Sequence, residues 1–269
     1  MGTQAAHHRM HREKIVDAVK SGQSLRATPS RLVTPLMLAV LAGFVLGGAL
    51  AAPVVAAEEP AGIDVSHWQG QIAWADVYAD GVDFAIAKAT EGRIYQDDQY
   101  TRNKERAEAN GIAFGAYHFA SPDTTANDAV TEANNFVDTA NLGPGNLRPV
   151  LDLEKSGGLG IRKLRQWVKA WLARVETRLG VKPIIYTSPS FWHDKMGNSR
   201  WFADNGHALW IAHWHVAAPR VPAKNWGGRG WTIWQYDDCG SVAGIAGCVD
   251  LDRLSPDVDI DDLRIPAGG

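Results

Sequence analysis

The sequence predicts an α/β protein whose strands close into a TIM-like barrel within a single domain. Apolar runs typical of buried strands alternate with amphipathic helical patterns, an order that favours a parallel sheet. Eight such runs fit within about 210 residues, and eight is the number of strands in a barrel of this kind. The helical patterns fade in the last third of the chain, so we expect loops to join the last strands. No internal repeat or low-complexity segment in the sequence indicates a further domain.

Each element is predicted from its local pattern. Strands are expected where short apolar runs are bounded by turn residues, and helices where apolar residues recur every three or four positions. The strand-like runs are residues 62–68, 82–92, 112–120, 148–154, 182–188, 207–214, 230–236 and 247–254. The helical patterns are residues 74–79, 99–111, 124–140 and 164–179, with a further helix beginning at Ser188-Pro189.

Residues 1–57 form a separate segment with the features of a secretory signal peptide. The stretch from Pro35 to Ala57 is apolar and uncharged, follows two arginines, and ends in small residues that suit cleavage after Ala57. The apolar run is also long enough to span a bilayer, so an N-terminal membrane anchor is the alternative. We therefore expect residues 58–269 to act outside the cell, secreted at the cell wall or retained there by the anchor.

The exported part of the chain is acidic. Residues 58–269 contain 21 basic and 28 acidic side chains, a net charge of −7. This balance argues against nucleic acid or an anionic membrane as the partner.

Two cysteines, Cys239 and Cys248, bracket the glycine-rich stretch GSVAGIAG. In an exported protein we predict that they form a disulfide closing a hairpin. A pair of buried thiols is the alternative, and two cysteines are too few for a zinc site of their own.

Asp152 and Glu154 end the fourth strand-like run, in the motif PVLDLE. Residues two apart on a strand share a face, so both carboxylates are expected to point into the barrel near its mouth. Two close carboxylates push their pKa values apart, so one stays protonated while the other is charged. Glycoside hydrolysis requires such a pair. The alternative is a helix N-cap followed by a solvent-facing acid.

Other acids at strand ends strengthen this interpretation. Asp64 ends the first strand-like run, and Asp250 and Asp252 lie in the last. The first and last strands of a barrel are neighbours, so Asp64 and Asp250 are expected side by side, facing the central pair. Lys88 is a candidate counter-charge for the cluster, or a structural partner of Glu91.

Aromatic and polar side chains at strand ends are candidate sugar-binding groups, because aromatic faces suit the apolar faces of sugar rings. The tryptophans at such positions are Trp68, Trp192, Trp210, Trp214 and Trp234, and the tyrosines are Tyr117, Tyr186 and Tyr236. The expected substrate-binding residues are Tyr117, Tyr186, Trp214, Gln235 and Lys88. Trp167 and Trp171 lie on the amphipathic helix 164–179 and are expected in the core.

A metal site is the alternative chemistry. His213 and His215 share a face of one strand, and Asp64, Asp250 or His118 would complete a ligand set of the kind found in deacetylases and zinc amidases. The spacing does not match a helical H-E-x-x-H motif. We therefore predict no metal and no cofactor.

The chain resembles glycoside hydrolase family 25, the Chalaropsis-type lysozymes. The motifs that carry the resemblance span residues 61–255: GIDVSHWQG, AKATEG, GIAFGAYHF, PVLDLE, IIYTSPSFW, LWIAHW, WTIWQY and CVDLD. The resemblance implies a barrel of five β/α units and three plain strands, (β/α)5(β)3, with residues 58–269 as the catalytic domain. It also implies cleavage, with retention, of the β-1,4 bond between N-acetylmuramic acid and N-acetylglucosamine in peptidoglycan, for wall remodelling or lysis.

The resemblance also implies roles for individual residues. Glu154 matches the general acid/base. Asp152 matches the residue that stabilises the charged intermediate, either as a nucleophile or by orienting the acetamido group of the substrate. Asp64 and Asp250 match two further active-site acids, and Tyr117 matches a tyrosine that lines the site.

Two other functions remain open from the sequence. A chitinase-like glycosidase also uses a strand-end D-x-E, but it requires an aspartate two residues before the first acid, where this chain has Val150. A non-catalytic module that binds cell-wall sugars is the second. The expected partner is the peptidoglycan glycan strand, with no obligatory protein partner and a monomeric state.

Overall fold

Residues 61–267 are described by a computed structural model of the protein. The predicted signal peptide or anchor, residues 1–57, lies outside the described residues. Within the described range, no helix combines the length and the apolar character needed to cross a membrane.

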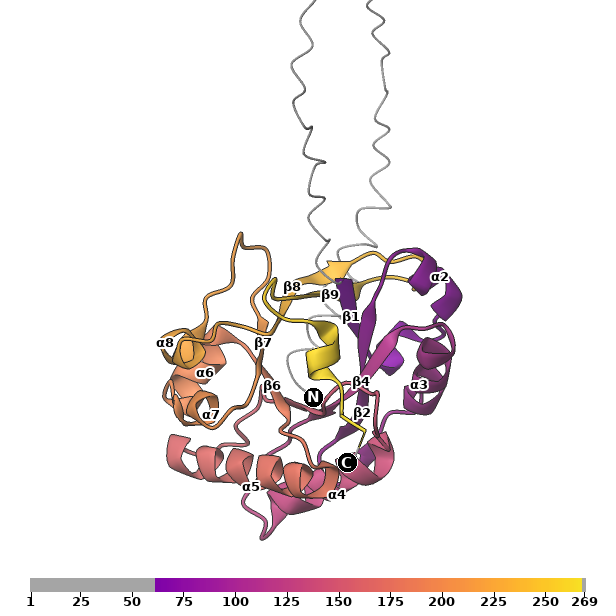
Figure 1. Ribbon diagram of the computed structural model, residues 1–269. Helices are drawn as coiled ribbons and strands as arrows, with labels where there is room; N and C mark the ends of the chain where they lie inside the picture. Colours follow the sequence, from indigo (N-terminus) through magenta and orange to yellow (C-terminus); the bar gives the residue numbers. More distant parts are fainter. Residues whose placement is uncertain (1–60, 268–269) are drawn as a thin grey trace, which may run out of the picture. The chain divides into compact units, whose positions relative to one another are not determined.

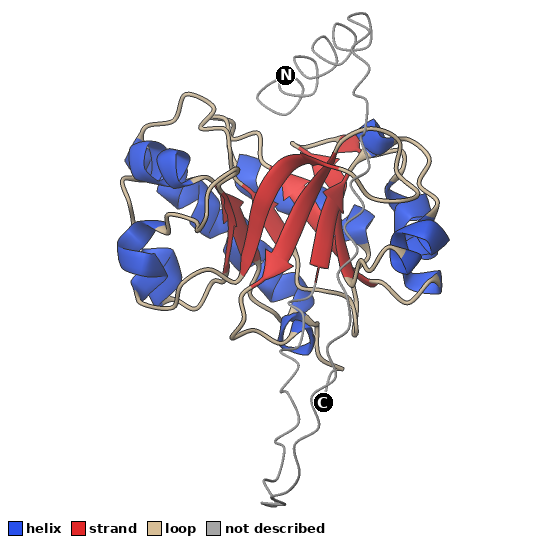
Figure 2. Cartoon of the chain, turned by 90° about the horizontal axis from the view of Figure 1, so that it is seen from above, coloured by secondary structure: helices blue, strands red, loops and turns tan. Residues whose placement is uncertain are grey.

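Nine strands form one sheet in the described part of the chain. They are β1 (Ala61–Val65), β2 (Phe84–Glu91), β3 (Tyr95–Gln96), β4 (Ala113–Phe119), β5 (Val150–Asp152), β6 (Ile184–Thr187), β7 (Leu209–Ala212), β8 (Ile233–Gly240) and β9 (Val249–Leu254). Their order is β1-β9-β8-β7-β6-β5-β4-β2-β3, and β1 also pairs with β2. That last pairing closes eight strands into a barrel, while β3 pairs with β2 alone. The predicted barrel is therefore confirmed, and Figure 2 shows its strands at the centre with the helices around them.

Among the eight barrel strands, one does not run in the predicted direction. The pairings among β1, β2 and β4 to β8 are parallel, but β9 is antiparallel to both β8 and β1. A parallel connection needs a crossover of a dozen or more residues. Only residues 241–248 separate β8 from β9, so the two strands form a hairpin and the expectation of a wholly parallel sheet is wrong here.

Helices cover the outside of the barrel (Figure 1). They are η1 (His67–Gln69), α2 (Trp74–Ala79), α3 (Tyr100–Ala109), α4 (Asp128–Ala140), α5 (Ile161–Leu179), α6 (Pro189–Met196), α7 (Trp201–Asp204), α8 (Pro222–Gly227) and η2 (Ile260–Leu263). The predicted start at Ser188-Pro189 is confirmed, because the Ser188 hydroxyl accepts a hydrogen bond from the amide of Phe191 (3.2 Å) and caps α6. Helix α4 begins later than predicted, after Asn127 in a left-handed conformation.

The apolar core has two parts, one between the barrel and its helices and one inside the barrel. In the first, Trp171 on α5 is fully buried and packs against Phe136 and His118, as predicted for this helix. In the second, the ring of Phe84 crosses the interior next to Gly62. A Cβ atom at Gly62 would lie 2.1 Å from that ring, so this position requires glycine.

The barrel has two distinct ends. The C-terminal ends of its parallel strands form the mouth, where enzymes of this architecture place their chemistry. The opposite end holds both termini of the described chain: β1 starts there at Ala61, and Arg264 pairs there with Leu147, shortly before β5.

Candidate active site

Four carboxyl groups gather at the mouth. Asp64 on β1 lies directly across the sheet from Asp250 on β9, while Asp152 ends β5 and Glu154 follows two residues later. The charge of Glu154 acts on each of the three aspartates, so the four acids form one cluster. The structure therefore brings together the acids that the sequence predicts there.

Asp250 reaches the mouth for a reason that the sequence interpretation missed. It is the second residue of β9, and β9 runs opposite to the other barrel strands. The N-terminal end of β9 therefore lies beside the C-terminal end of β1. A parallel last strand would have put that end at the other side of the barrel.

Backbone hydrogen bonds fix the direction of the D-x-E segment. The carbonyl of Asp152 accepts from the amide of Ala120 (2.9 Å), and the amide of Leu153 donates to the carbonyl of Tyr186 (3.0 Å). The chain thus remains extended and bonded on both sides up to the acids. Helix α5 begins only at Ile161, so the alternative in which the acids cap a helix is wrong.

Burial controls the protonation of these acids. Asp64, Asp152 and Asp250 are 3%, 2% and 8% exposed, whereas Glu154 is half-buried. Burial penalises a charged carboxylate. It raises the pKa of Asp64 to about 7 and the pKa values of Asp152 and Asp250 well above their usual range, with additional repulsion from Glu154 and Asp64 respectively. The mouth therefore holds protons at neutral pH that exposed carboxyl groups release.

Gln235 on β8 links three of the predicted residues. Its Nε2 donates to Asp64 Oδ2 (2.6 Å), and its Oε1 accepts from the Tyr186 hydroxyl (2.8 Å) and from Trp214 Nε1 (2.8 Å). Two donors at the oxygen and one acceptor at the nitrogen fix the orientation of the amide. The network thereby holds Asp64, Tyr186 and Trp214 at the same mouth.

Lys88 provides the positive charge that the sequence suggested, and it is also the structural partner of Glu91. Its Nζ lies 2.7 Å from Glu91 Oε2, while Glu91 Oε1 lies 3.1 Å from Lys155 Nζ. Lys88 also lowers the pKa of Asp152, opposing the effect of burial. The structure therefore shows the pair with Glu91 together with an effect of Lys88 on Asp152, so the pairing is not structural alone.

Tyr117 and Tyr186 line the mouth as neutral hydroxyl groups. Both are buried. Burial, together with the surrounding carboxylates, raises the pKa of each phenol well above 10. Both hydroxyl groups therefore keep their protons, and that of Tyr186 donates to Gln235 Oε1.

Asp252 is a fifth carboxyl group, to which the sequence interpretation assigned no role. It is 1% exposed, accepts a hydrogen bond from Trp210 Nε1 (2.8 Å) and interacts with Asp64. No hydrogen bond reaches its second oxygen, Oδ2, in residues 61–267. Its position two residues after Asp250 was the available signal, because both side chains point into the barrel.

The tryptophans at strand ends divide into two groups. Trp192, Trp210 and Trp234 are at most 2% exposed, so these three belong to the core and the expectation that they offer sugar-binding faces is wrong. Trp68 is 53% exposed and Trp214 is half-buried, which leaves both accessible to a ligand.

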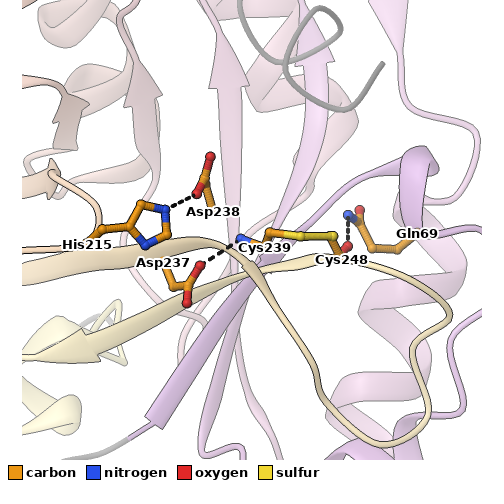
Figure 3. The surroundings of a disulfide bond; sticks show 6 residues. All are labelled: Gln69, His215, Asp237, Asp238, Cys239 and Cys248. Atoms are coloured by element: carbon orange, nitrogen blue, oxygen red, sulfur yellow. Dashed lines mark hydrogen bonds and ion pairs between the residues drawn. A yellow bond between two sulfur atoms is a disulfide. The ribbon is translucent and has the colours of Figure 1, made fainter. Parts of the chain in front are cut away.

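The predicted disulfide between Cys239 and Cys248 is present, and it closes the β8–β9 hairpin (Figure 3). The amide of Cys239 donates to Asp237 Oδ1 (2.9 Å), and Gln69 Nε2 donates to the carbonyl of Cys248 (3.3 Å). The disulfide thus closes the hairpin that carries Asp250, and the hydrogen bond from Gln69 links that hairpin to η1, which follows β1.

The metal-ligand set suggested by the sequence does not form. His118 is enclosed between Thr90 (2.7 Å) and Glu132 (2.8 Å), and His213 Nδ1 accepts from the amide of Arg220 (2.9 Å). In the described range, three groups able to bind a metal converge only at His215, Asp237 and Asp238 (Figure 3). That set lies on the rim and includes neither Asp64 nor Asp250.

The model of the glycosyl hydrolases family 25 matches residues 63–245. The chain is 40% identical over 206 residues to lysozyme M1 of Streptomyces globisporus, covering 72% of this chain and 67% of that protein. It is 32% identical to the N,O-diacetylmuramidase of Chalaropsis sp., covering 68% of this chain and 90% of that protein. The fold superposes on the crystal structure of the bacterial lysozyme from Streptomyces coelicolor with a TM-score of 0.70 at 36% identity, covering 77% and 96% of the two chains.

Proposed function

The chain belongs to glycosyl hydrolase family 25, and from this membership we propose that it is a peptidoglycan hydrolase of the lysozyme type. Its substrate is the glycan strand of the bacterial cell wall, cleaved at the β-1,4 bond between N-acetylmuramic acid and N-acetylglucosamine with retention of configuration. The observation that carries the proposal is the cluster of Asp64, Asp152, Glu154 and Asp250 at the barrel mouth. Lysozyme and muramidase names among the relatives support the same substrate.

Glu154 is proposed as the general acid and base. It is the most exposed of the four acids, so it is the one that a glycosidic oxygen at the mouth can reach. Burial and the charge of Glu154 raise the pKa of Asp152, so the pair favours holding one proton between the two carboxyl groups. When Glu154 holds that proton, it can protonate the leaving oxygen.

Asp152 is proposed to stabilise the positive charge that develops on the sugar ring, as a nucleophile or by orienting the acetamido group of the substrate. Lys88 favours the ionised form of Asp152, which this role requires. Asp64 and Asp250 are proposed to position the substrate and to keep the proton of the central pair in place, while Tyr117, Tyr186, Trp214 and Gln235 line the binding site.

We further propose that the domain from residue 58 onward acts outside the cell, at the cell wall, as a monomer. The disulfide supports this location, because disulfides persist in oxidising compartments. Residues 1–57 are proposed as the export signal or membrane anchor.

The test is digestion of purified peptidoglycan by the full chain, followed by mass spectrometry of the reduced fragments. Products that end in reducible N-acetylmuramic acid are expected. Products that end in reducible N-acetylglucosamine would instead identify a glucosaminidase. Glu154→Gln should abolish nearly all turnover while leaving the circular dichroism spectrum unchanged, and full activity in this variant would contradict the assigned role.

A further inference from the structure

A cleft of about 350 Å³ lies beside the mouth, on the side of α6 and α8. One wall is the start of α6, and the other is the segment that follows β7. The residues that line it are Pro189, Ser190, His193, Asp194, Asn198, Arg220, Val221, Pro222, Ala223 and Lys224. Its volume falls within the range of small-molecule binding sites.

Hydrogen bonds hold the two walls in place. The amide of Ala223 donates to Asn198 Oδ1 (2.6 Å), which joins the segment after β7 to the end of α6. The amide of Arg220 donates to His213 Nδ1 (2.9 Å). His213 precedes Trp214, whose indole donates to Gln235 in the mouth. The cleft is therefore a built feature that is connected to the mouth.

The cleft is cationic in an acidic domain. Arg220 and Lys224 are exposed, and within residues 61–267 neither forms an ion pair. The acid in the lining, Asp194, is bonded to the adjacent His193 (2.8 Å). The lining therefore carries two positive charges and one negative charge, and neither Arg220 nor Lys224 is paired with Asp194, which suits an anionic ligand.

The cleft lies within a short distance of the reacting bond. Pro189 is three residues after Tyr186, so their Cα atoms are at most about 11 Å apart. An extended peptide covers this distance with about three residues. In peptidoglycan, the lactyl group of N-acetylmuramic acid carries a peptide with free carboxylates, so an anionic chain of suitable length is attached to the sugar that would occupy the mouth.

We propose that this cleft binds the carboxylates of the peptidoglycan stem peptide, with Arg220 and Lys224 as the recognising groups. The inference rests on the proposed function, because it assumes that a muramic acid occupies the mouth. It adds a source of specificity outside the barrel: the enzyme distinguishes glycan strands that carry peptides from those that do not.

The test compares two substrates and two double variants of the full chain. Peptidoglycan with intact stem peptides and the same glycan after removal of the peptides by an amidase are digested, and kcat/KM is measured on each. R220S/K224S should lower kcat/KM about tenfold on the peptide-bearing substrate, since each exposed charge contact changes affinity a few-fold. It should leave the peptide-free glycan unaffected.

R102S/R106S on α3 is the matched control. It also removes two exposed positive charges without ion pairs in the described part of the chain, but on a helix across the barrel from α6 and α8 (Figure 1). The control should behave as the wild type on both substrates. An equal loss in both double variants would show a non-specific charge effect and overturn the proposal.

Other outcomes separate this inference from the proposed function. Equal activity of R220S/K224S and wild type on the peptide-bearing substrate would refute the cleft as a peptide site. If R220S/K224S loses activity only on cell walls that retain phosphodiester polymers, the cleft binds phosphate groups, and the proposal of a stem-peptide site is refuted. Failure of the wild type to release fragments from either substrate would refute the muramidase itself.

Discussion

Asp252 offers a direct test of how burial sets protonation in this barrel. Burial and the charges of Asp64 and Asp250 raise its pKa well above the usual range, so the folded protein holds a proton that the unfolded chain releases near pH 4. A group that binds more protons in the folded state makes the free energy of unfolding fall as pH rises. Each such proton contributes a slope of about 1.4 kcal/mol per pH unit between the unfolded and folded pKa values.

Asp252→Asn removes this titration and preserves the hydrogen bond from Trp210. The amide oxygen of the variant can accept the hydrogen bond from Trp210 Nε1 that Asp252 Oδ1 accepts in the wild type. At each pH above about 4 at which folded Asp252 keeps its proton, the stability of the wild type should therefore fall more steeply than that of the variant, by about 1.4 kcal/mol per pH unit.

The assay is urea unfolding of the full chain, followed by tryptophan fluorescence at pH 5, 6, 7 and 8. Asp252→Ala serves as the comparison, because it also removes the titration but leaves Trp210 Nε1 buried without an acceptor. It should be about 1–3 kcal/mol less stable than Asp252→Asn at every pH. Parallel curves of stability against pH for the wild type and Asp252→Asn would refute the reasoning, since they would show that Asp252 is ionised in the folded protein.

Three further substitutions test other parts of the structure. Gln235→Leu removes the hydrogen bond to Asp64 and the hydrogen bonds that Gln235 accepts from Tyr186 and Trp214. It should reduce kcat/KM on peptidoglycan about 100-fold with an unchanged circular dichroism spectrum. Wild-type rates in this variant would exclude a positioning role for Gln235. C239S/C248S opens a loop whose ends are nine residues apart in the sequence. It should lower the free energy of unfolding, measured in urea without reductant, by about 2.5 kcal/mol. The same urea midpoint in the variant and the wild type would contradict a stabilising role for the disulfide. Gly157→Ala places a Cβ atom 1.5 Å from a backbone oxygen at a φ of +55°, so thermal unfolding should show a loss of about 3 kcal/mol or more, and an unchanged Tm would disprove the steric argument.

The sequence predicted those features that depend on local periodicity. The positions of the eight barrel strands and of α5 follow from apolar spacing, and the D-x-E pair was placed at the mouth because alternate residues of a strand share a face. The closure of the barrel then placed Asp64 beside Asp250. These steps needed only one strand or one neighbouring pair at a time.

Features that depend on the packing of distant segments were not predictable in the same way. The sequence placed three tryptophans near strand ends, Trp192, Trp210 and Trp234. They are buried because residues from other parts of the chain pack around them. The antiparallel direction of β9 follows from the short connection between β8 and β9. Counting the strands did not take the length of this connection into account. The interaction of Asp252 with Asp64 could be recognised only once the residues around Asp252 inside the barrel were known.

The location of the two ends of the described chain also determines how the enzyme can be attached. Ala61 and the segment around Arg264 both lie at the end of the barrel away from the acids. A carrier protein or a solid support joined directly to either of these points is thus attached on the side opposite the acids. A domain immobilised in this way presents its open side outward, where a polymer many times its own length can approach without meeting the tether.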